Sequence, residues 1–401
     1  MKVIKSGVLI LFSLLLILQG SLFPVFGEEA VVPIHEVSAK TSDVGVAEGS
    51  LELPCKSAIL MEANTGTVLY TQNADEALPP ASVTKIMTLL LVMEAVDAGT
   101  VHLEDKISVS ANAASMGGSQ VYLKEGELMT LEDLLKSVVI ASANDAAVAL
   151  AEYICGSVPA FVEKMNTRAR QLGMENTVFE NVTGLDDTAE NHVTSAKDIA
   201  IMSRALISHR TILQYSSIWM DTIRNGEFGL TNTNRLVRFY PGCTGLKTGS
   251  TSKAGFCVSV TAERDGMSLI CVIMGAESRD VRNATATQLL DWGFANYGIY
   301  SADATELAPL PVLGGTSNFC RIAYSAFSCV LPKNEISSVE ITVTVPESLN
   351  APIKEGIAVG EAVFSVGGRV IGTRDVEALE GVERINFFEI FKRMFTRFLL
   401  I

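Results

Sequence analysis

The hydrophobic pattern along the chain predicts an α/β domain. Apolar runs separated by turn residues predict a strand–turn–strand hairpin over residues 58–70 and a second strand pair over residues 255–275. Apolar positions at helical spacing predict four helices, at residues 83–98, 131–154, 158–172 and 281–296. Strands at both ends of a helical stretch favour an antiparallel sheet flanked by helices, and we place this domain at residues 51–300.

The pattern changes after Tyr300. Residues 339–345 alternate strictly between apolar and polar side chains, which is typical of a half-buried strand. Short segments punctuated by Pro346, Gly356 and Gly360 follow. We therefore predict a small all-β domain at residues 301–381.

The beginning of the chain has the pattern of a secretory signal peptide. Lys2 and Lys5 precede an apolar run at residues 8–18, and small or apolar residues lead up to Gly27. The run is shorter than the roughly 20 apolar residues that span a bilayer. We expect residues 1–27 to direct export, with cleavage after Gly27 or retention as an anchor, and residues 28–50 to form a flexible leader.

The end of the chain, residues 382–401, is predicted to form an amphipathic helix. Five phenylalanines and Met394 recur at helical spacing, and Lys392, Arg393 and Arg397 fill the opposite face. An aromatic face with a basic polar side is typical of a helix that lies in a membrane interface. The alternative is that the phenylalanines pack on the protein itself.

Composition and charge exclude several classes of protein. The chain has 401 residues, of which 31 are Lys or Arg and 45 are Asp or Glu, so its net charge is −14. That sign argues against binding to nucleic acid through phosphate neutralisation. The four histidines lack the spacing of a zinc site, so we expect neither a metal nor a cofactor. The seven cysteines lack C-x-x-C spacing and are expected to be buried apolar side chains, although Cys320 and Cys329 could pair across a hairpin.

The first candidate for chemistry is an S-x-x-K motif formed by Ser82 and Lys85. On a helix these residues lie one turn apart, so the amine can reach the hydroxyl. A serine hydroxyl needs a neighbouring base to become a nucleophile. Lysine can be that base only if its pKa falls by about three units, a change worth roughly 4 kcal/mol that burial and nearby positive charge must supply. Since Ser250 and Lys253 have the same spacing, the motif alone is weak.

Two further short motifs supply polar groups. Ser142 and Asn144 form an S-x-N motif whose side chains can relay a proton and hold an amide, although a helix cap would have the same residues. Lys247, Thr248 and Gly249 form a K-T-G motif before the second strand pair. A cation, a hydroxyl and unobstructed backbone donors can together bind a carboxylate and an oxyanion.

The three motifs occur in the order S-x-x-K, S-x-N and K-T-G, separated by 60 and 105 residues. In this order the chain resembles the penicillin-recognising serine acyltransferases. Within them it is similar to the low-molecular-weight D-alanyl-D-alanine carboxypeptidases, on account of residues 80–88, 142–147 and 245–251. The resemblance covers nearly the whole chain that follows the predicted signal peptide, including the β-rich domain and the amphipathic tail.

The resemblance implies a catalytic role for three residues. Ser82 would attack the carbonyl of the penultimate D-alanine, and Lys85 would take its proton. Ser142 would pass a proton to the departing D-alanine. The implied substrate is a peptidoglycan stem peptide that ends in D-Ala-D-Ala, and β-lactams would be covalent inhibitors.

The resemblance also implies a substrate-binding role for five residues. Asn144 would orient Lys85 and the substrate amide, Lys247 would tune the field around Ser142, and Thr248 would hold the terminal carboxylate. Gly249 belongs to the same strand edge, and the backbone N–H groups of Ser82 and Ser250 would bind the oxyanion. The implied location is the cell wall or the outer face of the cytoplasmic membrane.

Other functions fit parts of the pattern. A class A β-lactamase would need a glutamate in an E-x-x-x-N loop, and residues 145–246 contain no such spacing. A DD-endopeptidase or transpeptidase shares all three motifs and stays open. A β-lactam sensor or a wall-binding scaffold would be a non-enzymatic alternative, against which the intact Ser82 and Lys85 argue. A Ser-His-Asp hydrolase would need His192, which we interpret as structural because G-x-S-x-G is absent from the sequence.

Overall fold

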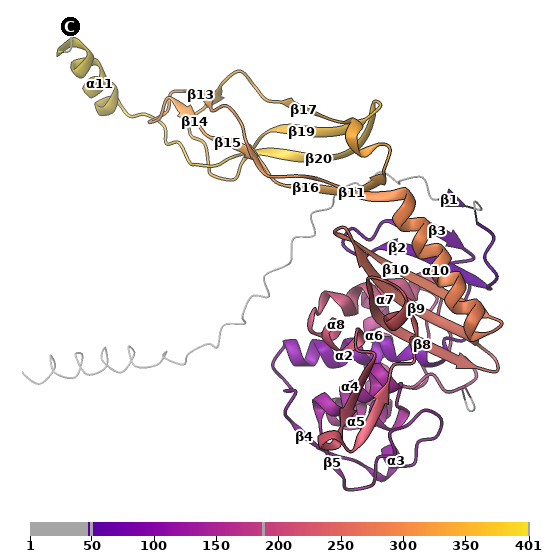
Figure 1. Ribbon diagram of the computed structural model, residues 1–401. Helices are drawn as coiled ribbons and strands as arrows, with labels where there is room; N and C mark the ends of the chain where they lie inside the picture. The colour runs from indigo at the N-terminus through magenta and orange to yellow at the C-terminus, as the bar shows by residue number, and fades with distance from the viewer. Residues whose placement is uncertain (1–46, 49–50, 187–188, 400–401) are drawn as a thin grey trace, which may run out of the picture. The chain divides into compact units, whose positions relative to one another are not determined.

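The structure is a computed structural model that describes residues 47–48, 51–186 and 189–399 (Figure 1). The predicted signal peptide at residues 1–27 lies outside the described residues. The same holds for the predicted leader at residues 28–50, apart from residues 47–48.

A six-stranded sheet organises the first domain, with strand order β1-β3-β2-β10-β9-β8. Its strands are β1 (Ala47–Glu48), β2 (Ser57–Glu62), β3 (Val68–Gln72), β8 (Cys243–Thr251), β9 (Gly255–Arg264) and β10 (Met267–Ala276). All neighbours are antiparallel except β1 and β3. The predicted hairpin and the predicted strand pair meet where β2 pairs with β10, which places Ile59 opposite Val272. Two segments about 200 residues apart thus form one sheet.

Each face of this sheet is covered by a separate apolar core. Ile59 and Met61 point into a large cluster with the helices that lie between β3 and β8, whereas Ala58 and Leu60 point into a second cluster with α10 (Arg279–Asn296). Alternation of side chains along a strand produces these two faces. The prediction of an antiparallel sheet flanked by helices is confirmed (Figure 1).

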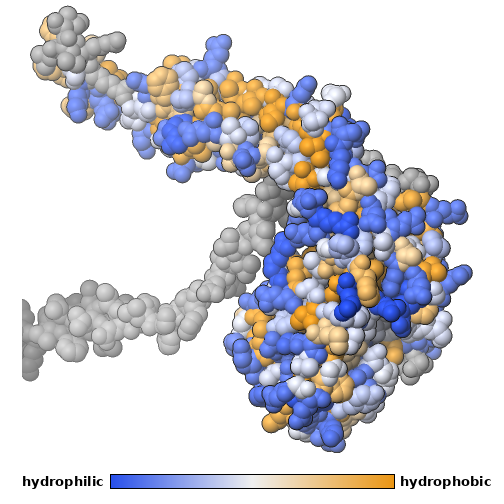
Figure 2. All heavy atoms as spheres, in the orientation of Figure 1, coloured by the Kyte–Doolittle hydropathy of each residue, from blue (hydrophilic) through white to orange (hydrophobic). Residues whose placement is uncertain are grey.

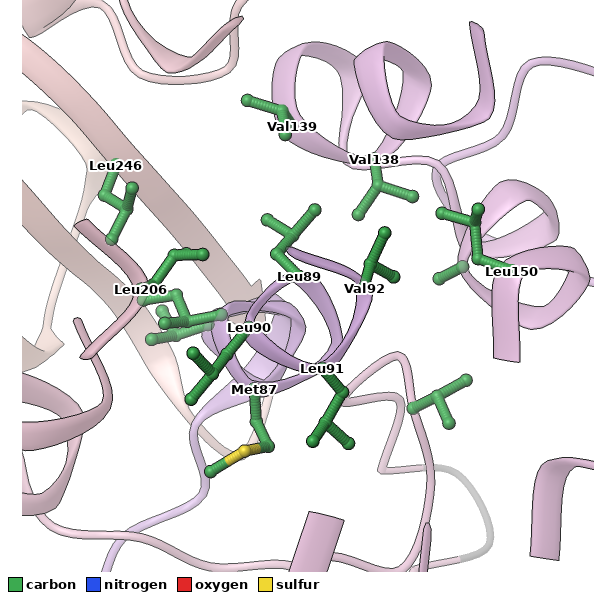
Figure 3. Close-up of a cluster of buried hydrophobic side chains, with 14 of the residues drawn as sticks. Met87, Leu89, Leu90, Leu91, Val92, Val138, Val139, Leu150, Leu206 and Leu246 are labelled. Atoms are coloured by element: carbon green, nitrogen blue, oxygen red, sulfur yellow. The ribbon is translucent and has the colours of Figure 1, made fainter. Parts of the chain in front are cut away.

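The helix α2 (Lys85–Asp97) lies at the centre of the larger cluster. Figure 3 shows Leu89 and Val92 of this helix directed toward Val138 and Leu150 of neighbouring helices. The residues Ile86 to Met93, including the polar Thr88, are all fully buried, so this part of α2 is enclosed on every side. A helix that is buried all round is held in place by packing, and it fixes the position of the residues just before it.

The remaining elements of this domain are short or lie around α2. The longer helices are α4 (Leu131–Ala141), α5 (Asn144–Cys155), α6 (Val158–Gln171) and α7 (Ala196–Ser208). The shorter helices are η1 (Ala81–Thr84), α3 (Ala111–Ala114), α8 (Thr211–Ser216), η2 (Arg224–Gly226) and α9 (Leu236–Phe239). Two small hairpins consist of β4 (Lys106–Ser108) with β5 (Leu128–Thr130) and β6 (Met220–Ile223) with β7 (Phe228–Thr231).

One predicted helix, residues 131–154, is wrong as a single element. The structure ends α4 at Ala141, and Ser142 adopts a left-handed conformation with φ 64°. The chain then turns, and α5 begins at Asn144, whose backbone N–H donates to the carbonyl of Ser119 at 2.7 Å. No glycine or proline marks this break, so hydrophobic periodicity alone joined the two helices.

The second domain is all-β, as predicted. It contains β11 (Tyr297–Ala302), β12 (Thr305–Glu306), β13 (Leu310–Leu313), β14 (Phe319–Cys320), β15 (Ile322–Tyr324), β16 (Phe327–Pro332), β17 (Val339–Thr344), β18 (Leu349–Asn350), β19 (Ala358–Val366) and β20 (Arg369–Ala378), with the short helix η3 (Ile336–Ser338) before β17. Five of them form one sheet, in the order β12-β15-β20-β19-β17. Figure 2 shows a band of apolar surface over this domain. Ile341 and Val343 of β17 are exposed.

The last described element is α11 (Phe387–Leu399), within the predicted tail helix. Its apolar side chains Phe387, Phe388, Phe391, Met394, Phe395 and Phe398 are all exposed. Within the described residues no single helix is long and apolar enough to cross a membrane; α5 and α6 reach that length and composition only together, with an 84° bend between them. All seven cysteines are free, so Cys320 and Cys329 form no disulfide.

Candidate active site

The S-x-x-K residues meet at the junction of η1 and α2. Ser82 lies in η1 and Lys85 is the first residue of α2, so the buried helix fixes the amine relative to the hydroxyl. The Nζ atom of Lys85 lies 2.9 Å from Oγ of Ser82, and it donates to the carbonyl of Thr183 at 2.8 Å. Lys85 is fully buried. The predicted contact between this amine and this hydroxyl is present in the structure.

The surroundings of Lys85 disfavour its positive charge. Burial lowers the pKa of Lys85 well below its ordinary value, the neighbouring Lys247 lowers it further, and Asp145 offsets part of the change. The pKa of Lys247 itself falls to about 7 because it is buried and close to Arg282. Burial and a neighbouring positive charge are the two causes that lower the pKa of a lysine so that it can act as a general base. A neutral amine beside Oγ of Ser82 can accept its proton.

Glycine at position 184 allows the segment around Ser82 to take its path. Ala81 has a left-handed backbone with φ 49°, and Gly184 packs against it. A Cβ atom on Gly184 would lie 1.8 Å from the carbonyl oxygen of Ala81. The approach of this loop also brings the Thr183 carbonyl to Lys85, so the sequence Thr-Gly at 183–184 supports the S-x-x-K pair.

The S-x-N residues are held by a loop at residues 117–123. Asn144 donates from Nδ2 to the carbonyl of Gly117 at 2.7 Å. Asp145 accepts the backbone N–H groups of Val121 and Leu123, which fixes the same loop. The Oδ1 atom of Asn144 is buried and has no hydrogen-bond partner among the described residues. An unpaired buried acceptor is costly, so this oxygen is suited to receive an N–H group of a ligand.

The relation between Asn144 and Lys85 differs from what the resemblance implies. Across the described part of the chain, Lys85 hydrogen bonds to Ser82 and Thr183, and Asn144 bonds through Nδ2 to Gly117. Besides Ser82, the hydrogen-bond partner of the Lys85 amine is thus the carbonyl of Thr183 and not Asn144. Asn144 is therefore available to a ligand rather than engaged with the lysine.

The K-T-G residues lie on β8, which is the edge strand of the sheet next to η1. Lys247 donates to the carbonyl of Thr248 at 2.9 Å, and the hydroxyl of Thr248 lies 2.8 Å from that of Thr233. A Cβ atom on Gly249 would lie 2.8 Å from the backbone nitrogens of both Ser82 and Val83. Glycine is needed here because the edge strand approaches the backbone of the nucleophile candidate so closely.

The three motifs surround one cavity of about 550 Å³. Five of the eight predicted site residues line it: Ser82, Ser142, Thr248, Gly249 and Ser250. The other three are buried and do not line it: Lys85 contacts Ser82, Asn144 follows Ser142 by two positions, and Lys247 precedes Thr248. Residues from three distant parts of the sequence thus form one site.

The cavity also contains residues outside the motifs. Trp219, Arg235, Arg279 and Arg282 line it, together with Asn232 and Thr233. Arg282 is buried, and its pKa falls to about 10 through burial and the nearby charge of Arg279. These arginines were missed because none belongs to a recognisable motif. Packing of α10 brings Arg279 and Arg282 to the site, and contact of α9 with β8 brings Arg235.

His192 has the contacts of a structural residue. Its Nδ1 accepts the backbone N–H of Glu180 at 3.0 Å, and its Nε2 lies 2.7 Å from Oγ1 of Thr84. Burial lowers the pKa of His192 to about 4, so the ring is neutral at physiological pH. Since it neither lines the cavity nor contacts Ser82, it supports the nucleophile segment through Thr84. Among the described residues, no three acidic, histidine or cysteine side chains gather as a metal site would require.

Comparison with known proteins places the chain in a family. The sequence profile of the family described as D-alanyl-D-alanine carboxypeptidase matches residues 44–278, more than half of the chain. The chain belongs to this carboxypeptidase family. A second profile, described as the C-terminal domain of penicillin-binding protein 5, matches residues 294–384 and covers the β-rich domain.

Individual carboxypeptidases of this family are similar over most of their length. D-alanyl-D-alanine carboxypeptidase DacF of Bacillus subtilis is 40% identical over 364 residues, which cover 89% of this chain and 93% of DacF. The structure of penicillin-binding protein 5 from Haemophilus influenzae superimposes with a TM-score of 0.73 at 30% identity, covering 83% of this chain and 99% of that one. Penicillin-binding protein D2 from Listeria monocytogenes in its ampicillin-bound form has a TM-score of 0.56 at 34% identity, covering 61% of this chain and 99% of that one.

Because β8 lies so close to the backbone at Ser82, adding a methyl group at Gly249 should destabilise the protein. We expect Gly249→Ala to reduce the free energy of unfolding by about 1–3 kcal/mol, because its Cβ would overlap the backbone of residues 80–83. Urea unfolding followed by tryptophan fluorescence measures this change. Gly229→Ala is the matched control, because a Cβ at this position in β7 meets no atom within 4 Å. Equal stability of the two variants would contradict the close approach.

Proposed function

We propose that this protein is a serine-type D-Ala-D-Ala carboxypeptidase that removes the terminal D-alanine from peptidoglycan stem peptides through an acyl-enzyme. Membership of the carboxypeptidase family supports the reaction class. The observation that carries the assignment of residues is the 2.9 Å contact between a buried lysine amine, with a lowered pKa, and the Ser82 hydroxyl at the wall of the cavity.

Acylation begins with Ser82. The neutral amine of Lys85 accepts the hydroxyl proton while Oγ attacks the carbonyl carbon of the penultimate D-alanine. The negative charge that develops on the carbonyl oxygen is stabilised by the backbone N–H groups of Ser82 and Ser250, which lie on η1 and β8. Close contact of these two elements at Gly249 makes this arrangement feasible.

The leaving D-alanine departs from the side of the cavity formed by β8. Its nitrogen takes a proton through Ser142, whose hydroxyl lines the same cavity. Thr248 and the buried Arg282 bind its carboxylate, since a guanidinium and a hydroxyl are strong donors to a carboxylate. Oδ1 of Asn144 accepts an N–H group of the peptide and so gains the partner that it lacks in the unoccupied protein.

Water hydrolyses the ester and regenerates Ser82. A β-lactam would form the same ester, but its leaving amine stays attached to the acyl group and remains near the site. The ampicillin-bound form of the related Listeria protein supports such a complex. Action as a β-lactamase is disfavoured, because the residues that line the cavity include no carboxylate that could activate water to hydrolyse the stable β-lactam ester.

The site of action would be outside the cytoplasm, where peptidoglycan lies. We propose that residues 1–27 export the protein and that the tail at residues 382–401 holds it at the outer face of the cytoplasmic membrane. Exposure of the phenylalanines of α11 supports the tail over the alternative of packing on the protein itself. Glu389 and Lys392 are among its polar residues.

Removing the proposed nucleophile tests the central assignment. We expect Ser82→Ala to abolish both release of D-alanine from diacetyl-Lys-D-Ala-D-Ala and covalent labelling by fluorescent penicillin, because the acyl-enzyme can no longer form. Both are measured on the same preparation, with circular dichroism as the control for folding. Persistent labelling of the variant would refute the role of Ser82.

The lowered pKa of Lys85 predicts the pH dependence of acylation. Protonation of Lys85 removes the proton acceptor, so the rate of penicillin labelling should fall as the pH falls through the pKa of this amine. Because burial and Lys247 lower that pKa, we expect the rate to stay high at neutral pH and its midpoint to lie well below 10.5. Labelling rates between pH 5 and 11, at roughly constant ionic strength, measure the profile. A midpoint near 10.5 would show that the amine keeps its ordinary basicity.

Deletion of the tail tests the membrane proposal. A chain without residues 384–401 should hydrolyse a soluble peptide at the wild-type rate but lose its association with vesicles that contain anionic lipid, because it lacks the exposed phenylalanines of α11 and the basic residues of the tail sequence. Sedimentation with the vesicles measures binding. If the shortened chain still sediments, the tail is not the anchor, and the N-terminal segment becomes the candidate.

A further inference from the structure

A small sheet of the second domain, with strand order β14-β13-β18, has an apolar outer face. Val312 and Cys320 point into a buried cluster, so their neighbours along the two strands point outward. Those neighbours are Leu313 and Phe319, whose side chains are 56% and 55% exposed, and the exposed Pro311, which is the register partner of Phe319. Pro311, Leu313 and Phe319 thus share one exposed face, which we call the β13–β14 patch.

Charged residues are absent from the strands of this small sheet. Residues 307–320, which contain β13, β14 and the turn between them, include no Asp, Glu, Lys or Arg, and neither do residues 348–353 around β18. In the whole chain 19% of residues are charged. The charged residues that flank the first stretch, Glu306 and Arg321, form an ion pair with each other at 2.7 Å. The patch can therefore leave water without the desolvation cost of an unpaired charge, which is typical of a surface that meets an apolar phase.

The turn between β13 and β14 is hydrogen bonded to the segment that leads into α11. The N–H of Ile385 donates to the carbonyl of Gly314 at 2.9 Å, and the N–H of Thr316 donates to the carbonyl of Glu383 at 2.8 Å. The helix α11 begins two residues after Ile385, and an extended residue spans at most about 3.6 Å. Figure 1 shows β13 and β14 at the end of the domain where the chain continues into α11. The start of the helix is therefore tied to the patch by roughly 7 Å of chain.

This short link limits how far the patch can be from a membrane that holds α11. An interfacial amphipathic helix buries its apolar face about 5–10 Å into the boundary between headgroups and acyl chains. The headgroup region on each side of a bilayer is itself about 5–8 Å thick. A turn that is tied to the start of such a helix by roughly 7 Å of chain lies at the level of the headgroups. The neighbouring Leu313 is then placed to reach the apolar layer.

Two other occupants of the patch fit the structure less well. The first is α11 itself, which could fold back on the patch; its phenylalanines are all exposed in the structure, so they do not cover it. The second is another copy of the chain. Three side chains offer much less than the roughly 800 Å² that each partner buries in a stable complex.

We propose that Pro311, Leu313 and Phe319 form a second lipid-contact surface, which enters the membrane interface beside α11 and holds the second domain against the bilayer. This inference rests on the proposed membrane role of the tail. Two linked contacts on one molecule bind a surface more tightly than either contact alone. The patch adds apolar contact, while the basic residues of the tail sequence attract anionic lipid.

The experiment measures binding of the full-length chain to vesicles of phosphatidylcholine with about one quarter phosphatidylglycerol. The test variant combines Leu313→Thr with Phe319→Thr, since threonine is compatible with a strand but lacks most of the apolar surface. The matched control combines Ile341→Thr with Val343→Thr, which removes two exposed apolar side chains from β17 in the other sheet of the same domain. The chain without residues 384–401 gives the binding that does not depend on the tail.

We expect the test variant to need about fivefold or more lipid for half-maximal sedimentation, because less apolar surface enters the interface. The control variant should change by less than about twofold. Both variants should release D-alanine from diacetyl-Lys-D-Ala-D-Ala at the wild-type rate, which shows that they are folded.

A second measurement reports the depth of the patch directly. Phe319→Trp places an indole in the patch, and Ile341→Trp places one on β17 as its control. With vesicles whose acyl chains carry bromine, a quencher of indole fluorescence, Phe319→Trp should lose more fluorescence than the wild type, which has only Trp219 and Trp292. Ile341→Trp should show no additional loss.

Three outcomes would overturn the inference while leaving the membrane role of the tail intact. The first is a test variant that binds vesicles as well as the wild type or better, as expected if α11 covers the patch. The second is an indole at position 319 that is quenched no more than one at position 341. The third is a wild type that sedimentation equilibrium shows to be a dimer, which the test variant disrupts without a loss of vesicle binding. A wild type that binds vesicles no better than the chain without residues 384–401 would instead refute the membrane role of the tail itself.

Discussion

The site depends on the burial of one lysine amine. An ammonium group loses its hydration when it is enclosed by protein, and Lys85 is fully enclosed at the start of the most deeply buried helix of the domain. The nearby Lys247 adds a like charge, so the neutral form is favoured twice. In the proposed mechanism, the packing around α2 therefore creates the base for Ser82, and the large apolar core contributes to catalysis.

The sheet supplies the second constraint, which is the distance between β8 and η1. Gly249 lets the backbone of the edge strand come within van der Waals contact of the residues around Ser82. Two backbone N–H groups from segments about 170 residues apart can thereby face one oxygen. The same edge carries Thr248, so in the proposed mechanism this one strand would both bind the carboxylate and stabilise the oxyanion.

Much of this arrangement could be predicted from the sequence. The S-x-x-K spacing on a helix start, the K-T-G strand and the alternation at residues 339–345 each reflect local geometry, and the structure contains the contact and the strands that they predict. The break at Ser142 could not be predicted, because no glycine or proline marks the left-handed residue, and α5 begins where Asn144 bonds to the loop at residues 117–123. The arginines of the cavity were missed for a similar reason: their position follows from strand register and helix packing, which leave no local signal.

The loop that carries Thr183 and Gly184 controls whether solvent can reach the amine of Lys85. Its carbonyl is a hydrogen-bond acceptor for Lys85, and its glycine packs against the strained Ala81, so a small outward movement of the loop would admit solvent to the amine. A hydrated amine regains its proton and can no longer act on the serine. Opening of this buried segment would thus inactivate the proposed base while most of the apolar core stays folded.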